Sequence, residues 1–322
     1  MTARDKYRTL CRTEPSIPVF SQDWWLDTVC GREKWDVILK EEKGRLLAAM
    51  PLYLPIPHIV SMPPFTQTMG PWFRPVTEDT KYSTALAQRQ EAGKMLASGL
   101  KKYSAFLQNF HYTVTDWLPF YWEGYRQTTR YTYLLNDIKD TGRMWENMSP
   151  HIRRHISRAG EKHRLSARRG VTAGELLRVH RLTFGRQGLK PRHTAVLERL
   201  VNTCLDRRQG DVWGGYDAED RLHAAAFVAW QDSSAYYIAG GTDPALCDSG
   251  AHALVLWQAI RDVSRYTSLF DFEGSMLPGV ERFFRGFGAA QTPYFTISRG
   301  KPGLWNRMMI KAATGGFIPI RR

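Results

Sequence analysis

The spacing of hydrophobic residues changes between Ser234 and Ser298, and this change predicts a strand, a long helix, a short strand, a short helix and a final strand. The long helix is expected from about Ser249 to Tyr266, with its apolar residues on one broad face. Asp248 or Ser249 can accept its first free N–H groups, and Gly240–Gly241 is expected to form a turn before it. The apolar positions are Ala253, Leu254, Leu256, Trp257, Ile260 and Val263.

Upstream of this segment the pattern predicts one strand, two helices and three strands. The first helix opens with the capping-box pattern Thr172–Glu175. The remaining expected elements are the strand Leu165–Arg169, the helix Thr194–Arg207, and the strands Asp211–Tyr216, Leu222–Trp230 and Ala235–Ala239.

The first half of the chain has a similar order of elements. Strands are expected at Trp35–Lys40 and Arg45–Leu54, followed by a proline-rich stretch from Pro55 to Pro75 that suits a loop lining a cleft. A surface helix at Thr80–Tyr103 comes next, then a strand, a short helix and another strand. The repeated order predicts two domains, 1–139 and 140–300, followed by a basic amphipathic helix or tail at 301–322.

Composition limits the class of protein. The chain has 322 residues, 43% hydrophobic and 24% charged, typical of a globular protein with room for two cores. We find no apolar stretch long enough to span a membrane, no signal peptide, and four widely spaced cysteines without a metal or redox motif. We therefore expect a cytoplasmic protein without a metal site. The net charge of +14 is compatible with polyanions such as tRNA, phosphorylated substrates, anionic membrane surfaces, or simply a solvated basic surface.

The segments FDFEGS, starting at Phe270, and RFFRGFGA, starting at Arg282, resemble the C-terminal part of the Fem-type transferases, which join two GNAT-like domains. The resemblance implies an α+β fold with two GNAT-like domains, each a central mixed sheet flanked by helices. It also implies an N-acyltransferase that transfers an acyl group to an amine of a cell-envelope precursor or amino sugar. The donor would be acetyl-CoA, another acyl-CoA or an aminoacyl-tRNA.

A strand that leads through a turn into a helix leaves N–H donors that suit an anionic group such as a diphosphate. Gly241, Ser249, Gly250 and Ala251 are therefore the expected cofactor-binding residues. The usual GNAT signature for this function is Gln/Arg-x-x-Gly-x-Gly/Ala. Aligned on Gly250, this sequence has Cys247 at the first position and His252 at the last.

The expected catalytic residues are Asp271, Glu273 and Tyr237. The two carboxylates flank Phe272 and can raise one another's pKa, which would supply a base; alternatively, one caps a turn and the other pairs with a nearby arginine. Expected substrate-binding residues are Arg153, Arg154 and Arg158, in the densest basic run of the chain, together with Ser275 and Arg285.

Three functions stay open at this point. The first is acyl transfer from an acyl-CoA to an envelope-precursor or amino-sugar amine. The second is aminoacyl transfer from tRNA, as in peptidoglycan-bridge formation. The third is a non-catalytic module that keeps the fold, which the departures at Cys247 and His252 favour.

Overall fold

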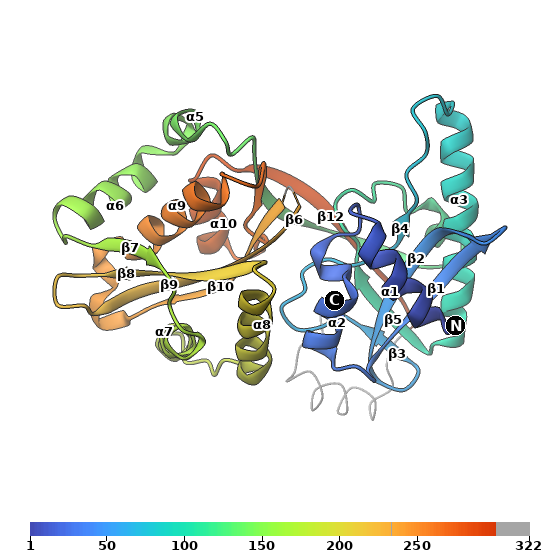
Figure 1. The fold of residues 1–322 in the computed structure, drawn as a ribbon, viewed down its shortest axis with the longest axis horizontal. Coiled ribbons are helices and arrows are strands. Elements are labelled where there is room, and N and C mark those ends of the chain that lie inside the picture. Colours follow the sequence, from blue (N-terminus) through green and yellow to red (C-terminus); the bar gives the residue numbers. More distant parts are fainter. Residues whose placement is uncertain (233, 301–322) are drawn as a thin grey trace. The chain divides into compact units, whose positions relative to one another are not determined.

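The computed structural model describes residues 1–232 and 234–300, which form two compact units (Figure 1). Unit 1 comprises Met1–Arg130 and the described residues from Pro293 onward, and unit 2 comprises Tyr131–Thr292. The chain therefore crosses between units inside two strands, at 130/131 and 292/293, whereas the sequence pattern placed the divisions at 139/140 and 300/301. The predicted basic helix at 301–322 lies outside the described residues.

Unit 1 has a mixed sheet with strand order β1-β2-β3-β5-β12, and β4 pairs with β2. The strands β3 and β5 are parallel, whereas β1/β2, β2/β3 and β5/β12 are antiparallel. Its helices and strands are α1 (Ala3–Thr13), η1 (Val19–Ser21), α2 (Asp23–Cys30), β1 (Trp35–Glu42), β2 (Arg45–Ile56), β3 (Ile59–Ser61), β4 (Trp72–Phe73), α3 (Tyr82–Gly99), η2 (Leu100–Lys102), β5 (Ala105–Asn109), α4 (Leu118–Trp122) and the start of β6 (Arg126–Asn136).

The two faces of the unit 1 sheet carry different helices because side chains alternate along β2. Met50 and Leu52 pack with Leu96 of α3 in one core. Trp35 pairs with Tyr53, next to Leu52 in β2, and therefore lies on the opposite face. On that face Trp35 packs edge-to-face against Tyr7 of α1.

Unit 2 has the sheet order β6-β11-β10-β9-β8-β7, in which only the β10/β11 pairing among those described is parallel. Figure 1 shows α5, α6 and α9 on one side of this sheet and α7 and α8 on the other. Its elements after β6 are α5 (Thr141–Asn147), α6 (Pro150–Glu161), β7 (Ser166–Arg169), α7 (Ala173–Arg186), α8 (Thr194–Asp206), β8 (Gly210–Tyr216), β9 (Leu222–Gln231), β10 (Ser234–Thr242), η3 (Pro244–Ser249), α9 (Ala251–Val263), β11 (Leu269–Asp271), α10 (Pro278–Arg285) and the start of β12 (Ala290–Arg299).

Each unit receives its last strand from the other half of the sequence. The strand β6 follows the unit 1 elements but pairs with β11 of unit 2. The strand β12 follows the unit 2 elements but pairs with β5 of unit 1. Each unit thus contains a parallel strand pair, β3/β5 in unit 1 and β10/β11 in unit 2. The second strand of each pair has an antiparallel neighbour from the other half of the sequence, so the predicted duplication of the mixed sheet is confirmed.

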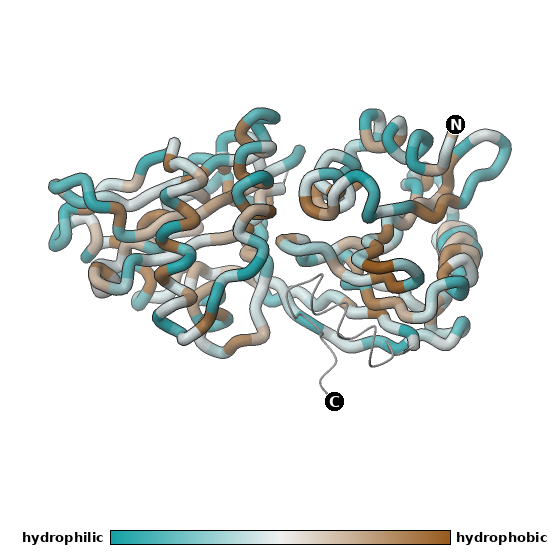
Figure 2. The backbone as a smooth tube through the Cα atoms, turned by 90° about the horizontal axis from the view of Figure 1, so that it is seen from below, coloured by the Kyte–Doolittle hydropathy of each residue, from teal (hydrophilic) through white to brown (hydrophobic). Residues whose placement is uncertain are grey.

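The core of unit 2 lies between β8–β11 and the helices α6, α9 and α10, and includes Trp213, Leu256, Phe270 and Phe272. Figure 2 shows brown, hydrophobic segments in the interior of each unit and teal, hydrophilic segments mostly at its periphery. The capping box predicted at Thr172–Glu175 is confirmed at the start of α7. The predicted glycine turn is wrong, because Gly240 and Gly241 lie within β10.

Candidate active site

The strands β10 and β11 separate in the middle of the unit 2 sheet. They pair at three positions only, Ser234–Tyr236 with Leu269–Asp271, after which β11 ends and β10 continues to Thr242. At the same point the register of β10 against β9 shifts, because Tyr237 pairs with Val228 and Ala239 with Phe227. Ile238 is the extra residue, and such bulges often occur beside active sites. The bulge therefore lies directly beside the point where the two strands part.

The chain reaches α9 through η3, and Gly250 has the left-handed backbone expected of a glycine, with φ +76°. A Cβ on Gly250 would lie 2.4 Å from the carbonyl oxygen of His155 in α6, and one on Gly241 would lie 2.5 Å from that of Val179 in α7. These two expected cofactor-binding glycines therefore serve close packing between helices and sheet.

Ser249 belongs to a buried chain of hydrogen bonds. The N–H of Ala251 donates to Ser249 Oγ (3.4 Å), and Ser249 Oγ lies 3.0 Å from Nδ1 of His223. Nε2 of the same imidazole lies 2.9 Å from Oδ2 of Asp217, and the hydrogen bond from His223, together with bonds from Arg221, holds the pKa of the Asp217 carboxyl well below its usual range. These contacts anchor the first turn of α9.

Tyr237 contacts the first turn of α9 rather than the two predicted carboxylates. Its hydroxyl oxygen lies 3.2 Å from Nε2 of His252, and Phe284 of α10 packs edge-to-face against its ring. Burial raises the pKa of Tyr237 and lowers that of His252 to about 4. Both side chains are therefore neutral at pH 7, and Nδ1 of His252 is buried without a hydrogen-bond partner among the described residues.

Asp271 and Glu273 lie together at the end of β11. Asp271 is 4% exposed, and its Oδ1 accepts hydrogen bonds from the Thr132 hydroxyl and, at 2.8 Å, from the N–H of Glu273. Burial raises the pKa of Asp271 to about 6, although these hydrogen bonds oppose the rise. Glu273 has a left-handed backbone, φ +60°, and its Oε1 is buried without a partner among the described residues. Burial, followed by the charge of Asp271, raises the pKa of Glu273 well above its usual value.

The predicted catalytic residues divide between the two faces of the sheet. Phe272 packs against Phe284 on the α10 side, as Tyr237 does. Asp271 precedes Phe272 in an extended strand and therefore faces the opposite side. The structure thus brings Asp271 and Glu273 together and pairs Tyr237 with His252.

The predicted substrate-binding residues lie on α6 and around α10. Arg154 and Arg158 are exposed and Arg153 is half-buried on α6, and among the described residues none of the three has a carboxylate within 4.0 Å. Ser275 accepts a hydrogen bond from the N–H of Leu277. Arg285 pairs with Glu281, with 2.8 Å between Nε and Oε1.

The parallel pair of unit 1 does not offer the same opening, because the proline-rich loop fills it. The N–H of Met69 donates to the carbonyl of Asn109, and Met69 then bridges to Phe110 in parallel. The Asn109 side chain donates to the carbonyl of Gln67. The loop also lines a small cavity, as its sequence predicts.

Several N–H groups of the η3–α9 segment already have acceptors within the protein. The N–H groups of Ala245 and Leu246 donate to Asp243, and that of Ala251 donates to Ser249. Protein atoms fill the spaces beside Gly241 and Gly250 that a ligand would otherwise use. Within 1–232 and 234–300, no group of three or more His, Cys, Asp or Glu residues is arranged to hold a metal ion.

Sequence reasoning missed the Asp217–His223 contact and the bulge at Ile238. Asp217 and His223 flank the β8–β9 turn, so the predicted hairpin was enough to indicate their contact. The bulge has no sequence signal beyond the nearby glycines, because it depends on the register against β9.

Comparison with known proteins finds a matching domain model and structures of similar fold. Residues 147–285 match the family model for the acetyltransferase (GNAT) domain. The fold is similar to the crystal structure of FemX, with a TM-score of 0.66 and 11% identity over 92% of this chain and 96% of that one. It is also similar to L-PGS from Bacillus licheniformis, with a TM-score of 0.55 and 14% identity over 99% and 97% of the two chains.

A third similar structure is a tandem GNAT protein from the clavulanic acid biosynthesis pathway, with a TM-score of 0.50 and 10% identity over 92% and 96% of the two chains. The comparison with curated proteins finds no match. No helix in the described part of the chain has the length and apolarity needed to span a bilayer. The chain therefore carries a GNAT acetyltransferase domain at residues 147–285 and has, over nearly its whole length, the tandem GNAT fold of the Fem-like acyltransferases.

Proposed function

We propose that this chain is a cytoplasmic N-acyltransferase that moves an acetyl or aminoacyl group from a thioester or ester donor to an amine of a cell-envelope precursor or amino sugar. The bulge at Ile238 supports this proposal most strongly, since β10 leaves β11 there. A backbone N–H at this bulge is suited to hold the carbonyl oxygen of the donor as negative charge develops on it.

The chemistry requires few protein groups. The acceptor amine attacks the carbonyl carbon, the C–S or C–O bond of the donor breaks, and the amine loses one proton. We assign Asp271 as the base, because a pKa of about 6 leaves it mostly ionised at pH 7 and close to the operating pH. Burial raises the pKa of Glu273 well above its usual value, which favours the protonated form that can donate a hydrogen bond in the site.

The test is a product assay by mass spectrometry. The purified chain is incubated with glucosamine and, separately, with a panel of acyl-CoAs and a panel of aminoacyl-tRNAs. We expect N-acylated glucosamine with one donor class. The Ile238→Pro variant, which lacks the amide N–H at a position extra to the ladder, should lower kcat about 100-fold, whereas Ile238→Val should not. Absence of product with both panels would contradict the proposal.

Helix α6 favours a second candidate, aminoacyl transfer from tRNA. The three arginines Arg153, Arg154 and Arg158 lack carboxylate partners among the described residues, and α6 packs directly against Gly250 at the start of α9. Such a cationic helix can contact RNA phosphates. It is also compatible with a peripheral contact to anionic lipid.

Salt dependence separates this candidate from a merely basic surface. We expect tRNA affinity to fall with salt, and the log–log slope to decrease by about two to three units when Arg153, Arg154 and Arg158 are all changed to Gln. The control variant changes the exposed Arg12, Arg32 and Arg126 of unit 1 to Gln. Equal slopes in the two triple variants would remove α6 as an RNA contact.

A further inference from the structure

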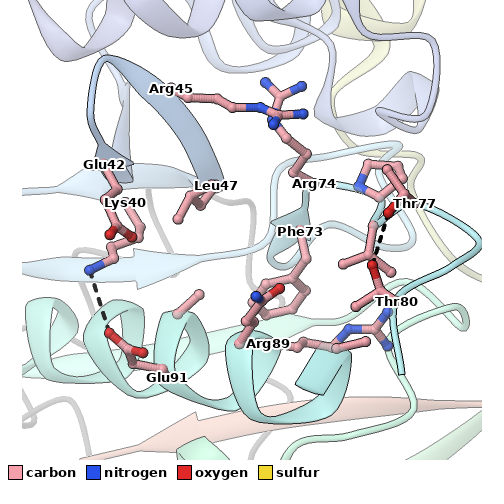
Figure 3. A pocket seen from close by; sticks show the side chains of 15 residues that line it. Lys40, Glu42, Arg45, Leu47, Phe73, Arg74, Thr77, Thr80, Arg89 and Glu91 are labelled. Atoms are coloured by element: carbon pink, nitrogen blue, oxygen red, sulfur yellow. Dashed lines mark hydrogen bonds and ion pairs between the residues drawn. The ribbon is translucent and has the colours of Figure 1, made fainter. Parts of the chain in front are cut away.

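Unit 1 contains a basic cavity of about 380 Å³ between β1, β2, β4 and α3 (Figure 3). Four cationic side chains line it, from Lys40, Arg45, Arg74 and Arg89, together with two carboxylates, from Glu42 and Glu91. The volume is within the range of small-molecule sites. Figure 3 shows Arg45 and Arg74 extending toward one rim and Arg89 lying on the far side of Phe73.

The cations of this cavity exceed its carboxylates. Lys40 has Glu91 at 3.8 Å, and Arg74 has Glu14 at 3.7 Å. Within the described ranges, neither Arg45 nor Arg89 has a carboxylate within 4.0 Å. Both side chains are exposed to water, and the excess of cations around one concave surface attracts an anion.

The cavity is partly preorganised for such an anion. Arg74 is held in place because its Nε donates to the carbonyl of Leu46 at 2.6 Å and its guanidinium stacks over Trp72. The hydroxyls of Thr77 and Thr80, 3.0 Å apart, add neutral donors near Arg89. Phe73 supplies an apolar ring surface between the two basic rims.

A second cavity of about 160 Å³ shares Phe73 and Arg89 as walls and is also lined by His111. Nδ1 of His111 lies 2.8 Å from the hydroxyl oxygen of Thr113 and 3.4 Å from its backbone nitrogen. Nε2 is buried and has no partner within the described residues. An unpaired buried polar atom costs about 1–3 kcal/mol, so this position suits a hydrogen-bond partner from a ligand or a water molecule.

We propose that unit 1 binds a phosphorylated small molecule in the 380 Å³ cavity, with its phosphate or diphosphate held by Arg45, Arg74 and Arg89. Guanidinium groups bind phosphate oxygens through two hydrogen bonds at once, and three of them with two hydroxyls match a group that offers many acceptors. Phe73 would contact the organic part of the ligand. This site is separate from the donor site proposed in unit 2 and does not depend on it.

Isothermal titration calorimetry of the full chain with pyrophosphate, at low salt, tests this proposal. We expect the wild type to bind one pyrophosphate per chain at the cavity. In the double variant Arg45→Gln/Arg89→Gln, the affinity for this pyrophosphate should be at least tenfold weaker. The matched control, Arg12→Gln/Arg126→Gln, removes the same charge from exposed positions of unit 1 outside the cavity and should bind as the wild type does.

One more variant and one more ligand complete the test. Arg89→Lys keeps the charge but loses the fork of donors, and should weaken pyrophosphate binding without loss of folding. Citrate, a tricarboxylate, should bind at least tenfold more weakly than pyrophosphate. Equal weakening in both double variants, equal affinity for citrate, or no binding by the wild type would each overturn the proposal. Pyrophosphate bound in unit 2 would persist in the Arg45→Gln/Arg89→Gln variant and so be recognised.

Discussion

Single residues at the end of β11 set a pH dependence. The pKa of Asp271 rises to about 6 in the folded chain because of burial, against an ordinary value of 3.8. The folded state therefore holds more protons than the unfolded state between about pH 4 and pH 6. Over this window the free energy of unfolding therefore falls as pH rises, and the titration of Asp271 accounts for up to about 1.4 kcal/mol of this fall per pH unit.

We expect Asp271→Asn to flatten this dependence, because the amide oxygen can still accept the bonds from Thr132 and Glu273. Glu273→Gln should also flatten it, since burial raises the pKa of Glu273 as well. Urea unfolding at pH 4.5, 5.5 and 6.5 measures both slopes. Asp79→Asn, at an exposed position, is the control, and an unchanged slope in Asp271→Asn would show that the carboxyl is not buried as described.

The imidazole of His223 supports the start of α9 by joining two buried polar groups. Replacing it with phenylalanine leaves the carboxylate of Asp217 and the hydroxyl of Ser249 without this partner. We expect a loss of about 1–3 kcal/mol in the free energy of unfolding, measured by chemical denaturation. Amide exchange should rise in the first turn of α9. The exposed His151→Phe should stay within about 0.5 kcal/mol of wild type.

The element scale is illustrated by the junction of α6 and α9. Gly250→Ala would place a methyl group 2.4 Å from the carbonyl oxygen of His155 at a φ of +76°. We expect a loss of more than about 2 kcal/mol, since the left-handed backbone alone costs about 1–2 kcal/mol for alanine. Gly160→Ala, on the exposed face of α6 with open space around it, should be neutral or stabilising by up to about 1 kcal/mol. Thermal and urea unfolding compare the two, and similar values would mean that α6 does not pack on Gly250.

Local elements could be predicted because their signals are local. The α7 capping box, the β1–β2 hairpin and the apolar face of α9 depend on residues a few positions apart, and all three are present. The bulge at Ile238 and the chain from Asp217 to Ser249 depend on strand register and on segments far apart in the sequence. Residue types alone therefore placed Asp271 and Tyr237 in one site, whereas strand alternation separates them.

At the scale of the whole chain, the exchange of last strands was not predictable from the order of elements. The sequence pattern assigns β6 to the first half and β12 to the second. Pairing assigns them the other way, through Phe270 with Leu135 and Ile297 with Gln108. A unit cut at the predicted boundary near 139 would keep β6 but lack β12, so it would be missing the partner of β5.

Two proline substitutions test this exchange against each other. Ile297→Pro removes an N–H that faces β5, because Phe110 donates to the carbonyl of Phe295 and the bonds alternate along an antiparallel ladder. It should raise hydrogen–deuterium exchange in β5. Leu135→Pro in β6 removes an N–H that faces β11 and should raise exchange there, although its partner Phe270 lies 135 residues later in the chain, and it should leave β5 protected. Ile297→Val and Leu135→Val keep the N–H and should match wild type. If each proline instead raised hydrogen–deuterium exchange only in the half of the sequence that contains it, the exchanged strand pairing would be wrong.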